Sequence, residues 1–207
     1  MFSISEQALL LTSAAMGASD SIGLKQQQVG QHVRRLREQA RLSVRALAAR
    51  TDFSPSFISQ LENGQVSPSI HSMEKIAGVL GATLGSFFAA IGSGEGGLIL
   101  RRAERQRLPS SWSNAEIEAL GRSSAQRRFE PILIVLSPGG RSGKHPVAHR
   151  AEEFAMILKG RVTLRLGPDE HRLAAGDSVT LLPGELRLWL NESKTACQIL
   201  IVGLQLG

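Results

Sequence analysis

Arginine side chains are concentrated in one short stretch of the chain, between Gly30 and Arg50. Six arginines occur there against a single acidic residue, Glu38. Guanidinium groups keep a permanent positive charge, and a cluster of them can neutralise phosphates and release the counterions of a nucleic acid. On an isolated helix they would form an ordinary solvated face, so the neighbouring elements decide between the two interpretations. The six are Arg34, Arg35, Arg37, Arg41, Arg45 and Arg50.

Two short helical patterns joined by a tight turn lie within this region, over Ser43–Gly64. Ser43 is a suitable N-cap for the first helix, because its hydroxyl can accept a hydrogen bond from a free backbone N–H of the first turn. Ser54 caps the second helix, and Pro55 stands at its first position, where a missing N–H does no harm. Two helices joined so closely form a helix-turn-helix, whose second helix can enter the major groove of DNA.

The residue spacing of this stretch resembles the helix-turn-helix of the Cro/CI-type repressors, also called the xenobiotic response element family. Asp52 stands where that family usually has glycine, and Val44 where it often has a glutamine that contacts phosphate. Asp tolerates left-handed backbone geometry better than most residues. The resemblance is carried by Ser43, Leu47, Ala48, Ser54, Ile58, Ser59, Leu61, Glu62, Gly64 and Pro68.

The resemblance also implies which residues contact DNA. Gln60 is the best candidate base reader, because a side-chain amide can form two hydrogen bonds to adenine. Ser56 and Ser59 are further candidate readers, whereas Ile58 and Leu61 are expected in the core. The expected DNA-contacting set, with its phosphate-binding and apolar members, is Ser43, Arg45, Ser54, Pro55, Ser56, Ser59, Gln60 and Asn63.

Apolar periodicity predicts three more helices, over residues 26–40, 70–80 and 84–90, and five helices in all match the whole repressor-type domain. The glycine-rich stretch that follows is typical of a flexible linker. The N-terminal stretch has an apolar run too short for a secretory signal or a membrane span. We therefore expect a flexible arm (1–25), a helix-turn-helix DNA-binding domain (26–90), a linker (91–97) and a second domain (98–207).

Composition limits the classes of function. The chain has 207 residues, enough for one large or two small domains, and 42% of them are hydrophobic. Its net charge of +6 and pI of about 10.4 favour a polyanionic partner. The single cysteine, Cys197, allows no disulfide framework, which fits a reducing cytoplasm, and its apolar surroundings indicate a buried core residue.

From Leu98 onward the hydrophobic pattern changes to short apolar or alternating runs separated by glycine and proline turns. Many short strands at such spacing predict an all-β sandwich or barrel, so the fold class is a two-domain α+β protein. The predicted strands are residues 98–100, 132–136, 154–158, 162–166, 178–182, 186–190 and 199–204.

This second half resembles the cupin jelly-roll barrels, over about Leu98 to Leu206. The usual cupin metal site needs two histidines two residues apart, a glutamate four residues later, and a third histidine in the second motif. Here Val147 replaces the first histidine and Arg187 the third, whereas His149 and Glu153 are kept. The resemblance is carried by His149, Glu153, Phe154, Leu158, Gly160, Leu173, Gly176, Asp177, Pro183, Gly184 and Asn191.

An arginine stays protonated and cannot bind a divalent metal. We therefore expect a metal-free pocket without a cofactor, in which Arg187 supplies positive charge and pairs with Glu153 or with an anionic ligand. His149, Glu153 and Arg187 are the candidate ligand-binding residues. One alternative is a rearranged metal site that includes His145; another is a purely structural Arg187 ion pair in a barrel that only dimerises.

Together the two halves predict a sequence-specific DNA-binding transcriptional regulator that works as a homodimer on a double-stranded operator. The barrel is expected to sense a small-molecule effector, and no catalytic residue or membrane partner is assigned. The rival function is a metal-dependent cupin enzyme or metal sensor tethered to a DNA-binding head, with His149 and Glu153 as an acid–base pair. A third interpretation is a DNA binder whose barrel takes no ligand.

Overall fold

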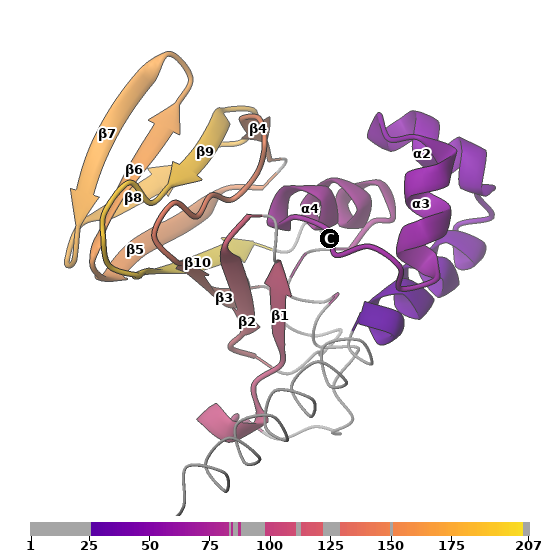
Figure 1. The fold of residues 1–207 in the computed structure, drawn as a ribbon, viewed down its shortest axis with the longest axis horizontal. Coiled ribbons are helices and arrows are strands. Elements are labelled where there is room, and N and C mark those ends of the chain that lie inside the picture. The colour runs from indigo at the N-terminus through magenta and orange to yellow at the C-terminus, as the bar shows by residue number, and fades with distance from the viewer. Residues whose placement is uncertain are drawn as a thin grey trace, which may run out of the picture.

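The computed structural model describes residues 26–82, 84, 87, 98–110, 113–121, 129–149 and 151–204. A helical half lies beside a β-sheet half, and helix α4 (Ile70–Val79) runs between the strands and the other labelled helices (Figure 1). The expected arm (1–25) and linker (91–97) lie outside the described residues, so the domain boundaries stay predictions. Within the described ranges no helix is long and apolar enough to cross a membrane.

The helical half begins with a helix over residues 26–39, followed by α2 (Val44–Thr51), α3 (Pro55–Glu62) and α4. A serine hydroxyl precedes each of the last three helices and accepts a hydrogen bond from the backbone N–H three residues later. These N-caps, Ser43, Ser54 and Ser69, satisfy a donor that the first turn leaves free. The caps predicted at Ser43 and Ser54, and the start of the helix predicted over residues 70–80, are thereby confirmed.

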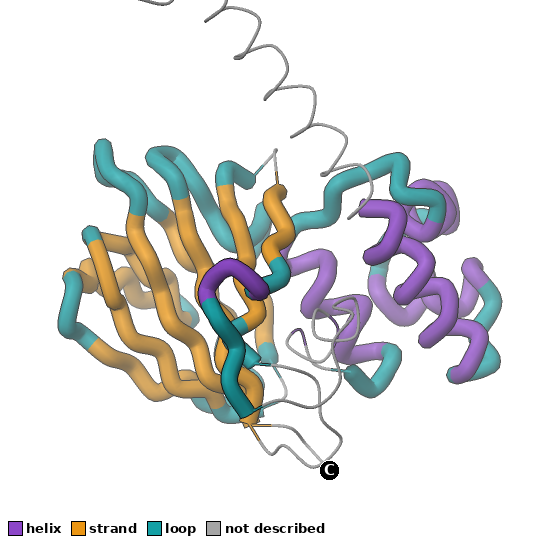
Figure 2. Tube along the Cα trace, turned by 90° about the horizontal axis from the view of Figure 1, so that it is seen from below, coloured by secondary structure: helices purple, strands orange, loops and turns teal. Residues whose placement is uncertain are grey.

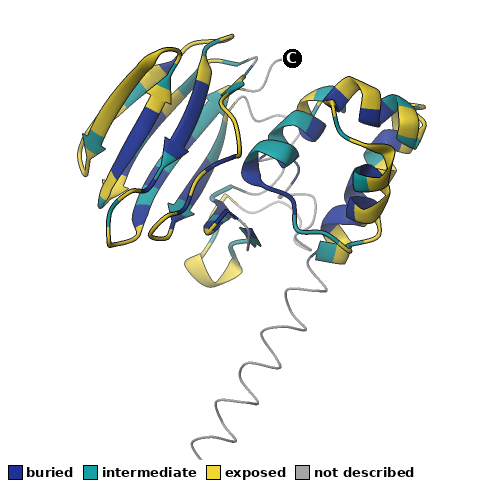
Figure 3. Cartoon of the chain, turned by 45° about the horizontal axis from the view of Figure 1, so that its top comes forward, coloured by how far each residue is buried: buried dark blue, intermediate teal, exposed yellow. Residues whose placement is uncertain are grey.

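Apolar side chains from each of these helices meet in one core, which the burial colours show on their inward sides (Figure 3). Of the fifth predicted helix (84–90), only Leu84 and Phe87 are described; both are helical and buried. Four helices are therefore delimited, and the expected count of five is not confirmed. Side chains with at most 1% exposure in this core include Val33, Leu47, Ile58, Leu61, Met73 and Ile76.

Two antiparallel sheets form the second half and face each other across an apolar interior (Figure 2). One sheet has the strand order β1-β2-β3-β10-β5-β8 and the other β4-β9-β6-β7. The predicted all-β domain is confirmed. The strands are β1 (Arg107–Ser110), β2 (Ala115–Ala119), β3 (Phe129–Leu136), β4 (Val147–Ala148), β5 (Glu153–Lys159), β6 (Arg161–Leu166), β7 (Asp169–Ala174), β8 (Ser178–Leu181), β9 (Leu186–Leu190) and β10 (Cys197–Leu204).

Strand prediction failed at two kinds of segment. The apolar run 98–100 is not a strand, and Leu98 is 98% exposed, because none of the described strands pairs with it. The opposite error concerns β1, β2, β4 and β7, which the apolar pattern missed. Strand β7 is polar and largely exposed, since it lies at the edge of its sheet, and β2 alternates Ala and Ile with glutamates.

Candidate functional site

The turn between α2 and α3 has the geometry that a helix-turn-helix requires. Asp52 ends α2 in the left-handed conformation, with φ 54° and ψ 31°, which confirms that it adopts the backbone of the family's glycine. The backbone N–H of Phe53 then donates to the carbonyl of Ala48. Ser54 caps α3 immediately afterwards, so only three residues, Asp52 to Ser54, separate the two helices.

Helix α3 presents a polar edge to solvent over an apolar base. Ile58 and Leu61 are 0% and 1% exposed, as expected for core residues that read no bases. All eight predicted DNA-contacting residues are exposed: Ser43 and Arg45 at the start of α2, and Ser54, Pro55, Ser56, Ser59, Gln60 and Asn63 along α3 and its caps.

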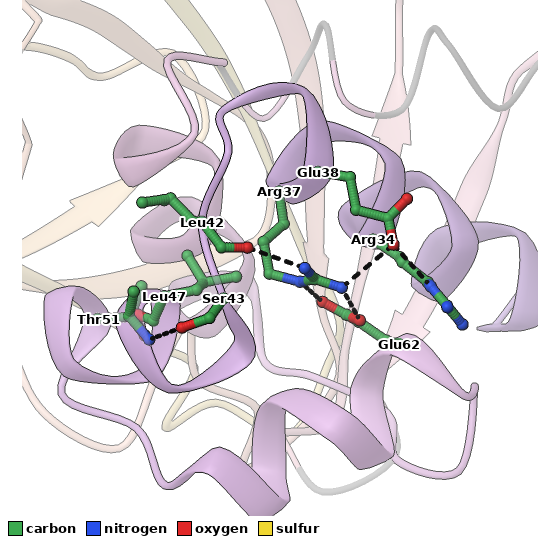
Figure 4. A network of polar contacts seen from close by, with 9 residues as sticks. Arg34, Arg37, Glu38, Leu42, Ser43, Leu47, Thr51 and Glu62 are labelled. Atoms are coloured by element: carbon green, nitrogen blue, oxygen red, sulfur yellow. Dashed lines mark hydrogen bonds and ion pairs between the residues drawn. The ribbon is translucent and has the colours of Figure 1, made fainter.

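The arginine cluster divides into buried and exposed members. Arg37 is buried: its Nε donates to Glu62 Oε1 at 2.6 Å, and its Nη2 donates to Glu62 Oε2 at 2.9 Å (Figure 4). These hydrogen bonds raise the pKa of the Arg37 guanidinium above its ordinary value. A third bond, from Nη1 to the carbonyl of Leu42 at 2.9 Å, completes an anchor between the first helix and the end of α3.

Three other arginines of the cluster, Arg41, Arg45 and Arg50, are exposed close to the helix-turn-helix. Arg34 is exposed as well and pairs with Glu38 on its own helix at 3.0 Å. The positive patch available to a polyanion therefore contains fewer than the six predicted arginines. Arg37 instead stabilises the packing of the helices.

The three candidate ligand-binding residues of the barrel meet in one cluster. Arg187 on β9 donates through Nη2 to Glu153 Oε2 on β5, which is one of the two contacts expected for this arginine. His149 lies between β4 and β5, with Nδ1 3.3 Å from Glu153 Oε1. The side chains of Arg187 and His149 are 3% and 13% exposed.

A fourth residue of this cluster comes from the helical half. Glu74 on α4 places its carboxylate Oε2 3.1 Å from His149 Nε2, and its side chain is 18% exposed. Burial alone would raise the pKa of Glu74, but the charges of His149, Arg187 and His71 and a hydrogen bond from His149 lower it. Glu74 was missed because sequence patterns do not say which surface of α4 meets the other domain. The only signal in the sequence that could have indicated Glu74 as a site residue was its position beside the apolar stripe of α4, next to Met73.

His149 is consequently held between two carboxylates. Burial by itself would lower its pKa, yet the charge of Glu74 and the hydrogen bonds to Glu153 and Glu74 outweigh it and raise the pKa to about 9. The imidazole is therefore protonated at neutral pH and donates from both ring nitrogens. Two cations, His149 and Arg187, face two carboxylates in this cluster.

Close contacts join α4 to the barrel around Glu74. The backbone N–H of His71 donates to the carbonyl of Ser142 at 3.2 Å. His71 also packs tightly on Gly143: a Cβ added to Gly143 would lie 2.8 Å from the Cβ of His71. A cavity of about 10 Å³ remains inside the barrel, next to Glu74 and His149. Arg187, Trp189 and His71 are among its lining residues, and Arg187 Nη1, Trp189 Nε1 and His71 Nδ1 are buried without a hydrogen-bond partner among the described residues.

A much larger cleft, of about 430 Å³, opens beside this cavity between α4 and the barrel. Glu74, His149, Val147 and Ile201 line both spaces. On the α4 side the cleft is bordered by Lys75, Gly78 and Val79, and on the barrel side by Ile132, Ala148, Glu153, Gly203 and Leu204.

The residues present do not fit the metal ion that cupin barrels usually hold. Arg187 occupies the position expected for the third histidine. Its guanidinium contacts Glu153, and its permanent positive charge repels a metal cation. In the described part of the chain no three His, Cys, Asp or Glu side chains are arranged to bind a metal.

Comparisons with known proteins agree with this division of the chain. Residues 28–85 match a family described as "Helix-turn-helix domain", and residues 132–203 match "Cupin domain". The HTH-type transcriptional regulator PuuR of Escherichia coli (strain K12) is 25% identical over 172 residues, which cover 83% of this chain and 91% of that protein. PuuR of Shigella flexneri matches to the same extent.

A solved structure shows the same fold over nearly the whole chain. The HTH_3 family transcriptional regulator from Vibrio cholerae superposes with a TM-score of 0.72 at 22% identity, covering 90% of this chain and 99% of that one. The helical domain, the barrel and their order are thus shared. The chain is therefore identified as a helix-turn-helix transcriptional regulator of the Cro/CI type that carries a C-terminal cupin domain.

Proposed function

We propose that the protein is a homodimeric, sequence-specific DNA-binding regulator whose cupin barrel senses a small anionic ligand without a metal. It works on a double-stranded operator in the cytoplasm, independently of membranes, and catalyses no reaction. Gln60, Ser56 and Ser59 read bases, and the exposed side chains around them hold phosphates. His149, Glu153 and Arg187 form the ligand site.

The exposed polar edge of α3 is the observation that carries the DNA-binding part of this proposal. Base readers must be free to reach the groove while the opposite side of the helix is held in the core. Gln60 is exposed on the polar edge of α3, and Ile58 is buried on the opposite side. Ser43 and Ser54 accept backbone hydrogen bonds as caps, and each hydroxyl keeps its own hydrogen to donate to a phosphate oxygen.

An apolar outer face on the six-stranded sheet supports the homodimer. Residues that lie directly opposite each other on paired strands share one face, and Leu200 on β10 lies opposite Leu133 on β3 and Met156 on β5. Large apolar side chains at the margin of this face are 43–55% exposed. Contiguous exposed apolar surface of this kind is typical of a protein–protein interface. They are Phe129, Phe154, Leu158 and Leu204.

The charges of the barrel pocket support an anionic ligand. Arg187 and protonated His149 are both largely buried and face Glu153 and Glu74, so a group that replaces either carboxylate must itself be negative. Arg187 Nη1 and Trp189 Nε1, which have no acceptor within the described ranges, point to a further acceptor, which a carboxylate or similar group supplies.

Selection of bound sequences from a pool of random DNA duplexes, with the full-length protein, tests this function. We expect a pseudo-palindrome with half-sites about 34–36 Å apart, one helical turn, or a multiple of that distance, because a two-fold dimer presents two copies of α3. A pool that stays random after repeated rounds would contradict sequence-specific binding. An enriched single half-site would contradict the dimer alone.

A further inference from the structure

We propose that Glu74 is an internal ligand of the barrel. Its carboxylate occupies the anion site of the pocket, and a carboxylate effector binds by taking its place, which separates α4 from the barrel. This inference rests on the ligand-sensing part of the proposed function and not on DNA binding.

Charge balance in the pocket defines what can replace Glu74. The described cluster has two cations, His149 and Arg187, and two carboxylates, Glu153 and Glu74. If Glu74 left without a substitute, either one positive charge would stay buried and uncompensated or His149 would have to lose its proton, and both changes are unfavourable. A ligand with one carboxylate restores the balance.

Unpartnered donors explain how an effector competes with a group that is already held nearby. Glu74 contacts His149, whereas Arg187 Nη1 and Trp189 Nε1 have no acceptor among the described residues, and Arg187 and Trp189 line the inner cavity but not the cleft. A free carboxylate is not tied to a helix and can move deeper to accept from both donors. Each new charge-assisted hydrogen bond favours the effector over Glu74.

The two adjoining spaces fix the shape of the effector. With Glu74 in place the inner cavity measures about 10 Å³, which holds one water molecule at most. Glu74 lines both this cavity and the 430 Å³ cleft, so its withdrawal joins them. The carboxylate of the effector then lies at Arg187, and its body lies in the cleft against Val79 and Ile132.

Helix α4 connects this site to the DNA-binding motif. The residue after Glu74, Lys75, places its Nζ 3.3 Å from Asp52 Oδ2 and 5.5 Å from the ring centroid of Phe53. Asp52 and Phe53 form the turn between α2 and α3. A displacement of α4 that removes Glu74 from the barrel therefore also acts on the turn that orients α3.

Acetate is a suitable probe, because it is the carboxylate of Glu74 without the chain. A Trp112→Phe background leaves Trp189, which lines the pocket, as the sole tryptophan and the fluorescent reporter. We expect acetate, compared with chloride at equal ionic strength, to bind Glu74→Ala at least tenfold more tightly than the parent. Glu74→Gln keeps the shape of the side chain and is therefore less prone to misfold than Glu74→Ala. Its gain in acetate affinity should be smaller.

Two further variants make the result specific. Glu74→Ala combined with Arg187→Met should lose the gained acetate affinity, whereas Glu170→Ala, which removes an exposed carboxylate on β7, should behave as the parent does. Equal acetate affinity for the parent and both Glu74 variants would overturn the proposal. So would acetate binding that survives the loss of Arg187.

Hydrogen exchange of the His71 backbone amide reports the separation of the two halves. This amide is in the first turn of α4, where it lacks a helical acceptor, and it donates to Ser142 of the barrel. Its exchange should accelerate at least tenfold when acetate saturates Glu74→Gln. Unchanged exchange at saturation would overturn the displacement of α4. Neither measurement contains DNA, so failure of the DNA-binding function would leave both results interpretable.

Discussion

At the scale of single residues, His149 joins the two halves of the molecule, because it contacts Glu74 of α4 and Glu153 of the barrel. Its pKa in the folded protein, about 9, exceeds the ordinary value of 6.5. Folding therefore favours the protonated form. The corresponding stability is fully present below pH 6.5 and is lost as the pH rises towards 9.

We predict that the free energy of unfolding, measured by chemical denaturation, falls between pH 6.5 and 9. Each pKa unit corresponds to about 1.4 kcal/mol, so the complete loss is about 3 kcal/mol. Glu74→Gln removes the largest of the contributions that raise the pKa of His149, and the pH dependence of this variant should be clearly weaker. Parallel pH profiles for both proteins would contradict the contact between Glu74 and His149.

Residue roles were predictable where the chain replaces one member of a known pattern. The pair Arg187–Glu153 follows from an arginine at a histidine position, and the structure contains it. The role of Arg37 was not predictable, because its buried partner Glu62 lies 25 residues away and sequence patterns give no such pairing. The same holds for Glu74, which needs the docking of one domain on another.

At the scale of elements, Gly30 allows the first helix to lie against the end of α3. A Cβ at this position would be 2.3 Å from the carbonyl oxygen of Leu61 and 2.6 Å from that of Glu62, both of which are backbone atoms that cannot rotate away. We predict that Gly30→Ala destabilises the protein by roughly 1–3 kcal/mol in chemical denaturation, since the helices must move apart.

Gly78 on α4 provides the matched comparison. A Cβ there meets nothing within 4 Å, so Gly78→Ala gains helix propensity without a clash and should stabilise by about 0.5–1 kcal/mol. A Gly30→Ala variant that is as stable as the parent would contradict the close packing at Gly30, and a destabilised Gly78→Ala variant would contradict the open space at Gly78.

Most elements were predictable from local signals. The serine caps and the proline at the start of α3 gave the positions of the helices, because these residues act within one turn of the chain. Most strands with an apolar core face were found as well, but β2 was missed although it alternates alanine and isoleucine with glutamates. Strands β1, β4 and β7 were missed because short length, a proline or a polar edge position removes the alternation that predicts a strand.

At the scale of the whole molecule, the apolar face of the six-stranded sheet predicts how two chains associate. Phe154 on this face is 43% exposed, and Phe154→Glu should convert the dimer to a monomer in sedimentation equilibrium, because a buried charge without a partner opposes association. Leu186→Glu is the matched control: Leu186 is 51% exposed on the other sheet, and its replacement should leave the dimer intact. Dissociation by both variants, or by neither, would contradict this interface.

Sequence reasoning predicted the two domains and their order but not their contact. The glycine-rich stretch indicated a loose connection, whereas the described residues show α4 docked on the barrel through Glu74 and His71. This interface joins residues about 70 positions apart in the sequence. The hydrophobic pattern of neither domain predicts the contact between them. This is the information that only the three-dimensional structure supplies.

Binding of DNA by the Gln60→Ala variant tests the central claim, that the polar edge of α3 reads base pairs. Affinities for the selected operator and for unrelated DNA are measured at one salt concentration, with Gln28→Ala, an exposed glutamine of the first helix, as control. We predict a loss of about 1–3 kcal/mol on the operator for Gln60→Ala, unchanged binding to unrelated DNA, and no effect in the control. An equal loss on both DNAs, or no loss on either, would contradict the claim.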